Sequence, residues 1–260
     1  MMLCLDVGNS QLYGGVFDGD ELTMQFRRST ASRGSSDELG LFLRGVLREN
    51  DVDPQSIDEI AICSVVPDYL YTLRACCEKY FGVEPLLLRP GVRTGLRIRY
   101  KDPKEVGADR IADAVGALHL FPGRHLIIAD FGTATTLAAV SRERDFLGGA
   151  ILPGVRLAME ALEEKTAALP NVEIVQVATA LGRSTVESIQ SGLFWSNVGM
   201  IRELTGRLAQ EAFADERPLV IATGGFSQLF ARTGLFDHLV RELILTGLRE
   251  IAKLNRDAAE

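Results

Sequence analysis

Residues 3–12, LCLDVGNSQL, determine how this chain is interpreted, because residues 127–136, IIADFGTATT, repeat their pattern. Each stretch has apolar residues, then Asp, one apolar residue, Gly and a run of small hydroxyl or amide side chains. Each is followed by residues with hairpin character, and the first hairpin turns at Asp18-Gly19-Asp20. The repeated order of strand and hairpin predicts two related halves. The alternative is chance recurrence of the short pattern D-x-G-[NT].

Short runs rich in β-forming residues alternate with stretches of helical periodicity along the chain. This alternation predicts an α/β fold. Residues 121–125, FPGRH, interrupt a helix and mark the boundary between a half of residues 1–120 and a half of residues 121–260. The predicted helices are residues 36–50, 68–80, 107–120, 153–169, 185–213 and 235–255.

The composition is that of an ordinary globular protein, with 47% hydrophobic and 24% charged residues. The net charge of −7, without a visible basic face, argues against a nucleic-acid-binding protein. No run approaches the ~18 apolar residues of a membrane helix, so we expect neither a membrane span nor a signal peptide. The cysteines form no CxxC motif and predict reduced core thiols in a cytoplasmic protein. They are Cys4, Cys63, Cys76 and Cys77.

The D-x-G-[NT] pattern suits a phosphate-binding loop. Glycine at a strand end lets backbone N–H groups approach an anion, and the small polar side chains add donors. An Asp before such a loop can hold the metal that accompanies phosphate. Two such loops facing each other would bind a polyphosphate from both sides. The alternative is that Asp6 and Asp130 only stabilise turns.

A third stretch, residues 220–227 (VIATGGFS), is a predicted strand followed by paired glycines against which an adenine ring could lie. The P-loop motif GxxxxGK[ST] is absent. The letters DFG at residues 130–132 lack the other protein-kinase motifs. The three motifs together therefore predict a nucleotide-binding protein of a different class.

Asp109 is the candidate base. It stands near the N-terminus of the predicted helix of residues 107–120, whose core positions are Ile111, Ala114, Val115 and Leu118, and it lies about 200° from Ile111 on that helix. A carboxylate there can orient an alcohol and accept its proton in phosphoryl transfer, or it can simply complement the helix dipole. Both interpretations remain open. Arg110 would offer a donor fork to a substrate, and Gly107 would allow close approach.

The chain resembles the type III pantothenate kinases nearly from end to end. The resemblance rests on seven blocks in order: DVGNS, SVVP, YKDPKEVGADR, DFGTATT, GGAILPG, LGRSTVESIQSG and ATGG. That family belongs to the acetate kinase/Hsc70/actin-like superfamily. The resemblance implies duplicated ribonuclease-H-like (actin-like ATPase) halves with a cleft between them, and dimerisation helices in the second half.

The resemblance also implies a reaction: ATP-dependent phosphorylation of pantothenate to 4′-phosphopantothenate, the first step of coenzyme A biosynthesis. Asp109 corresponds to the proton acceptor, and Asp130 to a site for a monovalent cation, K⁺ or NH₄⁺. Mg²⁺ is expected with ATP. The positions that correspond to ATP contacts are Asp6, Val7, Gly8, Asn9, Ser10, Gln11, Leu12, Tyr13 and Thr133.

Pantothenate contacts are implied at Tyr100, Gly107, Ala108, Asp109, Arg110 and Thr185. In the family Thr185 corresponds to a residue contributed across the interface of a homodimer. Its predicted helix carries Ile189, Leu193, Phe194 and Trp195, which suit a buried interface and equally an ordinary core.

Two departures from the family pattern stand beside binding positions. Leu137-Ala138 replaces the common Phe-Asp, and Arg183 replaces a Lys. Three other functions are the alternatives: a non-catalytic relative acting as a transcriptional accessory factor, an actin-like filament protein, and a sugar kinase of the same superfamily. Retention of Asp6, Asp109 and Asp130 argues against the non-catalytic role.

Overall fold

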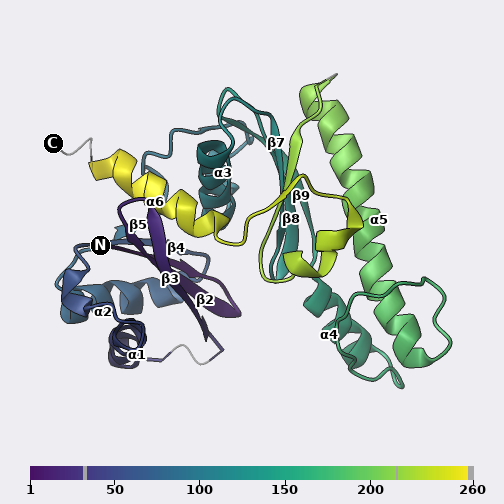
Figure 1. The fold of residues 1–260 in the computed structure, drawn as a ribbon, viewed down its shortest axis with the longest axis horizontal. Helices are drawn as coiled ribbons and strands as arrows, with labels where there is room; N and C mark the ends of the chain where they lie inside the picture. Colours follow the sequence, from purple (N-terminus) through teal and green to yellow (C-terminus); the bar gives the residue numbers. More distant parts are fainter. Residues whose placement is uncertain (32–33, 215, 257–260) are drawn as a thin grey trace. The chain divides into compact units, whose positions relative to one another are not determined.

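The computed structural model describes residues 1–31, 34–214 and 216–256, and it groups the chain into two compact units (Figure 1). The first unit contains residues 1–96, 102–119 and the chain from residue 243; the second contains residues 97–101 and 120–242. The units are therefore not two consecutive stretches, because the last helix packs with the first sheet. The division of the duplication at residues 120 and 121 stays a prediction.

The first unit is built on a mixed sheet with strand order β3-β2-β1-β4-β5. Its strands are β1 (Met2–Val7), β2 (Gln11–Asp18), β3 (Glu21–Ser29), β4 (Glu59–Ser64) and β5 (Leu86–Leu87). The first three form an antiparallel meander, whereas β4 and β5 run parallel to β1. Gly19 takes φ 59° in the tight turn of the predicted hairpin, a conformation that favours glycine.

Alternation along β1 places a helical layer on each face of this sheet. Leu3, Leu5 and Val7 pack in one core cluster, and Met2 and Cys4 pack in another. The helices of the unit are α1 (Ser36–Arg48), α2 (Leu70–Phe81), α3 (Ala108–Leu120) and α6 (Leu243–Arg256), with short turns η1 (Pro54–Ser56), η2 (Pro67–Tyr69) and η3 (Pro103–Glu105). The first cluster contains residues of α1 and α2, and the second contains residues of α3 and α6.

Helices α3 and α6 meet backbone to backbone. A Cβ atom on Gly247 would lie 1.8 Å from the Ala112 carbonyl oxygen, and one on Gly116 would lie 2.3 Å from the Leu243 carbonyl oxygen. Only glycine fits at either position. This contact fixes the place of α3, which carries Asp109, against the closing helix.

The second unit repeats the arrangement. Its strands are β6 (Arg97–Ile98), β7 (Leu126–Phe131), β8 (Ala134–Val140), β9 (Asp145–Pro153), β10 (Leu219–Thr223) and β11 (His238–Leu239), in the order β11-β10-β7-β8-β9-β6. Helices α4 (Val155–Lys165) and α5 (Thr185–Phe213) and the turn η4 (Ser227–Thr233) complete it. Ile127, Ala129 and Phe131 of β7 pack with residues of α4, α5 and η4 in one core cluster.

The two sheets share one topology. The order β3-β2-β1-β4-β5 corresponds strand for strand to β9-β8-β7-β10-β11, with an antiparallel meander first and parallel strands after it. The α/β prediction is confirmed, and the common topology supports duplication over chance recurrence. The helix predicted from residue 235 begins only at Leu243, because residues before it form β11 beside β10.

Two smaller features complete the description of the fold. All four cysteines are free and buried. In the part of the chain that the structure describes, no helix is long and apolar enough to cross a membrane.

Candidate functional site

The first candidate loop follows β1 and is tied to the end of β3. The Gly8 amide donates to the Gln11 carbonyl oxygen at 2.9 Å, which closes a turn. The Thr30 hydroxyl donates to the carbonyl oxygens of Gly8 (2.9 Å) and Asn9 (2.8 Å), and the Thr30 amide donates to that of Ser10 (3.1 Å). These bonds turn the loop carbonyls toward the protein, away from any anion at the loop. Sequence reasoning did not identify Thr30.

The predicted ATP loop, residues 6–13, divides into an accessible part and a buried part. Asn9 and Gln11 are exposed, whereas Leu12 and Tyr13 are buried. The Tyr13 hydroxyl donates to Gln25 Oε1 at 2.6 Å, and the Arg27 guanidinium lies 4.0 Å from the Tyr13 ring centroid. The side chains of Leu12 and Tyr13 therefore belong to the body of the sheet, and the turn before them is the accessible segment.

The structure brings Asp6 and Asp109 to the same place in the first unit. Asp6 pairs in register with Cys63 on β4, so the two side chains lie on the same face of the sheet. Burial, and then the negative charges of Asp6, Asp109 and Asp113, hold the pKa of the Cys63 thiol well above its usual value. Three carboxylates thus act on one thiol, two of them from α3. Asp113 was not identified from the sequence.

Asp109 stands in the first turn of α3, half-buried. Its Oδ1 atom accepts a hydrogen bond of 2.8 Å from the Arg110 amide. A Cβ atom on Gly107 would lie 2.4 Å from that same oxygen, so glycine leaves the space that the carboxylate occupies. This local bond uses one carboxylate oxygen and leaves both the catalytic and the helix-terminal interpretation of Asp109 open. Arg110 itself is only 6% exposed.

The second candidate loop lies at the end of β7, held between two glycine turns. Asp130 on β7 pairs in register with Thr223 on the parallel strand β10. A Cβ atom on Gly224, which has φ 88°, would lie 2.2 Å from Asp130 Oδ1, and one on Gly154 would lie 2.2 Å from the Thr133 carbonyl oxygen. The ATGG and LPG motifs therefore both pack directly on the DFGT loop.

Two implied pantothenate positions lie in the second unit. Tyr100 packs against Phe146, with ring centroids 5.8 Å apart. Thr185 begins α5 and is exposed; the helix is capped by Ser184, whose hydroxyl accepts from the Glu187 amide at 3.2 Å. The remaining implied positions, residues 107–110, lie in the first unit.

The departures from the family pattern lie in structural positions. Leu137 and Ala138 are buried in the middle of β8 (0% and 3% exposed). The Arg183 amide donates to Glu187 Oε2 at 2.7 Å, a bond that any residue other than proline could make. On α5, Ile189, Leu193 and Phe194 belong to the core of the second unit, and Trp195 is 36% exposed.

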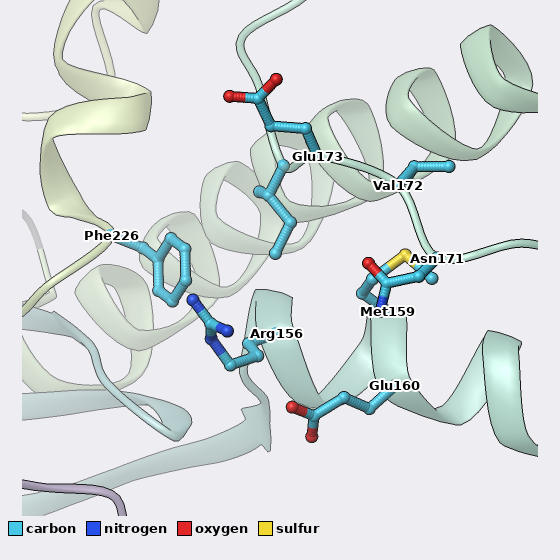
Figure 2. Close-up of a pocket in the computed structure, with 8 residues that line it drawn as sticks. Arg156, Met159, Glu160, Asn171, Val172, Glu173 and Phe226 are labelled. Atoms are coloured by element: carbon cyan, nitrogen blue, oxygen red, sulfur yellow. The ribbon is translucent and has the colours of Figure 1, made fainter. Parts of the chain in front are cut away.

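A pocket of about 300 Å³ lies beside the turn that follows β10 (Figure 2). Met159 and Val172 are its buried residues. Figure 2 shows the Arg156 guanidinium directed toward the Phe226 ring, whose centroid is 5.6 Å away. The Phe226 amide donates to the Phe131 carbonyl oxygen at 3.1 Å, so this aromatic wall is joined to the DFGT loop. The other lining residues are Glu160, Asn171, Glu173 and Ile174.

A larger groove of about 930 Å³ lies in the second unit, lined by residues of α4 and α5. It is mostly apolar, and Thr185 is among its lining residues. Leu157 on α4 is 46% exposed there.

Among the residues described, no group of three or more His, Cys, Asp or Glu side chains is arranged to hold a metal ion. Mg²⁺ that binds together with a nucleotide needs only one or two protein carboxylates, because phosphate oxygens and water complete its shell. The carboxylate of Asp6 fits that role in its donor chemistry.

The sequence comparisons agree on one family. A family profile described as type III pantothenate kinase matches residues 2–207. A type III pantothenate kinase of Legionella pneumophila (strain Corby) is 54% identical over 255 residues, 98% of this chain and 99% of that protein. Type III pantothenate kinase 1 of Francisella tularensis subsp. holarctica (strain OSU18) is 44% identical over 98% of this chain and 100% of that protein. MreB 5 of Spiroplasma citri, solved with AMPPNP bound, shares the fold, with a TM-score of 0.55 and 10% identity over 99% of this chain and 97% of that one.

Proposed function

The chain belongs to the type III pantothenate kinase family, and from this premise we propose that it transfers the γ-phosphoryl group of ATP to the primary hydroxyl of pantothenate. The product is 4′-phosphopantothenate, which enters coenzyme A biosynthesis. The observation that supports the proposal is that Ala108, at the start of α3 beside Asp109, packs against the core cluster that contains Cys63, the register partner of Asp6.

In this mechanism the turn at residues 8–11 binds ATP phosphates through backbone and small polar donors. Asp109 orients the pantothenate hydroxyl and accepts its proton as the O–P bond forms and the bond to ADP breaks. Residues 107–110, with Tyr100 and Thr185, hold the acceptor. That the Asp6 loop and Thr133 contact one and the same triphosphate stays a prediction.

Two cations complete the proposal. Asp6 would hold Mg²⁺, which would neutralise the developing charge on the phosphates when bound with ATP. Asp130 would hold a monovalent cation, K⁺ or NH₄⁺. The close packing of Gly224 on Asp130 Oδ1 supports this role, because it leaves room for backbone but not for a side chain beside the carboxylate.

A coupled ADP-release assay with pantothenate, sugars and acetate as acceptors tests the reaction. We expect turnover with pantothenate and ATP, and activation by a monovalent cation. Turnover with a sugar but not with pantothenate would establish the sugar-kinase alternative. The absence of turnover with every acceptor, in a protein that is folded by circular dichroism, would favour the non-catalytic alternative.

The pocket in Figure 2 is our candidate for the base of ATP, with Phe226 as the stacking surface. Stacking of a base on an aromatic ring is worth about 1–3 kcal/mol. Phe226→Leu, which keeps the apolar volume, should therefore raise KM for ATP by about fivefold or more, with KM for pantothenate unchanged. Phe226→Tyr keeps the aromatic face and should behave as the wild type. Equal ATP affinities of the Leu and Tyr variants would contradict this assignment.

We also propose that the chain forms a homodimer in which the apolar groove of α4 and α5 is covered by a second copy, with Thr185 reaching the partner's site. The family supports this proposal, and so do the exposed Leu157 and Trp195 on these helices. Leu157→Arg buries a charge in that contact, so it should raise the dimer dissociation constant at least about tenfold and lower turnover per chain at low protein concentration. Sedimentation velocity measures the first effect.

The control for the dimer is Tyr71→Arg, because Tyr71 is 84% exposed on α2, far along the chain from this groove. It should leave the dissociation constant unchanged. A wild-type chain that sediments as a monomer with full activity would contradict the shared site. We further expect the protein in the cytoplasm, where its four free thiols stay reduced.

A further inference from the structure

Charged and aromatic residues alternate in the segment RIRY, residues 97–100, at the edge of the second sheet. Strand β6 begins this segment and runs parallel to β9, and the register pairs Arg97 with Asp145 and the next residue with Phe146. Successive side chains of a strand point to opposite faces. The two arginines and Asp145 therefore share one face, and Tyr100 and Phe146 share the other.

Both arginines donate to one carboxylate, that of Asp145. Arg97 makes two hydrogen bonds of 2.9 Å to it, from Nε to Oδ1 and from Nη2 to Oδ2, and Arg99 Nε donates to Oδ1 at 2.7 Å. The bonds from Arg97 contribute most to lowering the pKa of the Asp145 carboxyl, so it is ionised at neutral pH. We call these three residues the Asp145 clamp.

The carboxylate of the clamp is fixed by the turn that precedes β9. Ser141 Oγ accepts hydrogen bonds from the amides of Glu143 (3.2 Å) and Asp145 (3.3 Å), and the Ser141 amide donates to the Asp145 carbonyl oxygen at 2.9 Å. The Asp145 side chain is 14% exposed, whereas those of Arg97 and Arg99 are 58% and 55% exposed. Asp145 is therefore the anchored member, and the two arginine side chains are held to it.

The clamp lies directly before Tyr100 in the chain. The Arg99 amide donates to the Phe146 carbonyl oxygen at 2.9 Å, and the Tyr100 ring packs on the buried Phe146 ring, with the planes inclined at 59°. A Cβ atom on Gly148 would lie 4.0 Å from Tyr100 Cε1, so the ring also lies beside the β9 backbone. Because β6 has two residues, the side-chain bonds of the clamp are a large part of what holds this segment on β9.

We propose that Asp145 is a positioning residue: its clamp on the two arginines holds β6 against β9 and so fixes the Tyr100 ring where it contacts pantothenate. The inference rests on the proposed role of Tyr100 in binding pantothenate. Asp145 itself touches neither substrate in this scheme. Its loss should therefore weaken the binding of the acceptor and leave the binding of ATP and the chemical step intact.

The opposite edge of the same sheet offers a matched control. There the two-residue strand β11 follows Asp237, whose carboxylate accepts from Arg217 Nη2 (2.7 Å) and from the Val220 amide (2.8 Å). The Asp237 side chain is 21% exposed, close to the 14% of Asp145. Asp145→Asn and Asp237→Asn each remove a carboxylate from one edge of the sheet, and only the first edge carries Tyr100.

Hydrogen exchange, measured by mass spectrometry on peptides that contain residues 97–100, tests the clamp independently of activity. In Asp145→Asn these amides should exchange about three- to tenfold faster, because two ion pairs that share one carboxylate are lost. Arg97→Gln changes a side chain that is more than half exposed, so it leaves the core intact and should accelerate exchange in the same segment by a smaller factor. Asp237→Asn should leave this segment unchanged.

Steady-state kinetics test the link to Tyr100. Asp145→Asn should raise KM for pantothenate by about three- to tenfold, with kcat and KM for ATP within about twofold of wild type. Asp237→Asn should keep the wild-type KM for pantothenate. Tyr100→Ala should raise this KM at least as much as Asp145→Asn does. Adding Asp145→Asn to Tyr100→Ala should then change it by less than about twofold, because both substitutions act through one side chain.

Several results would overturn the proposal. Unchanged exchange of residues 97–100 in Asp145→Asn would show that the carboxylate does not hold β6. Independent, multiplying effects of Asp145→Asn and Tyr100→Ala on KM, or equal effects of Asp145→Asn and Asp237→Asn, would show that Asp145 does not act through Tyr100. A wild-type KM for pantothenate in Tyr100→Ala would instead refute the proposed role of Tyr100, and the positioning role would fall with it even if exchange were faster.

Discussion

Asp109→Asn should lower kcat by about 10²–10⁴-fold, the usual contribution of a positioned general base, while KM for ATP changes little. The substitution keeps the size of the side chain, and the amide oxygen can still accept the 2.8 Å hydrogen bond from the Arg110 amide. The start of α3 should therefore survive. What is lost is the carboxylate that we propose accepts the proton of the pantothenate hydroxyl. Steady-state kinetics with ADP release as the readout measure both constants.

Gly107→Ala tests the same carboxylate by a different route. The added methyl would lie 2.4 Å from Asp109 Oδ1 and within 4 Å of no other residue's atoms, so the side chain of Asp109 must move while the backbone stays. We expect a lower kcat with an unchanged melting temperature. Near-normal turnover in Asp109→Asn, together with a lowered melting temperature, would show that Asp109 only stabilises the N-terminus of α3.

The duplicated fold could be predicted because its signal is local. Each D-x-G motif ends an apolar run that predicts a strand, and a hairpin follows it directly in the chain. The order β1-β2-β3 and its repeat β7-β8-β9 could therefore be predicted. The position of α6 could not be predicted from the sequence. Its packing on α3 depends on contact between Gly247 and Ala112, which are far apart in the chain and individually unremarkable.

Those residues of the candidate site that stand in a recognisable motif could be predicted. Asp6, Asp109 and Asp130 stand in blocks with recognisable spacing. Thr30 and Gly154 act through long-range contacts: Thr30 binds the carbonyls of the first loop, and Gly154 packs on the second. No periodicity or spacing shows such contacts. Leu12 and Tyr13 show the reverse case, since they match the ATP motif yet their side chains are buried in the sheet.

Gly224→Ala should be strongly destabilising, because two independent constraints meet at this residue. Its φ of 88° disfavours any side chain, and an added Cβ would lie 2.6 Å from the Phe131 nitrogen and 2.7 Å from the Phe131 carbonyl carbon. Backbone strain and overpacking each cost about 1–3 kcal/mol. We expect the melting temperature of the second unit to fall by about 5–20 °C in scanning calorimetry.

Gly225→Ala is the control, because it shows whether the loss of stability comes from strain and overpacking at Gly224 or from a general need for glycine in the ATGG turn. Gly225 has no positive φ, and an added Cβ would meet nothing within 4 Å, so Gly225→Ala should leave the melting temperature unchanged or raise it slightly. The Gly224 methyl would also lie 2.2 Å from Asp130 Oδ1. Activation by K⁺ or NH₄⁺ in the surviving folded fraction should therefore weaken, because the carboxylate that we assign to the cation is displaced.

Equal melting temperatures of the two alanine variants would contradict the packing argument. Unaltered cation activation in Gly224→Ala would show that Asp130 does not hold the cation.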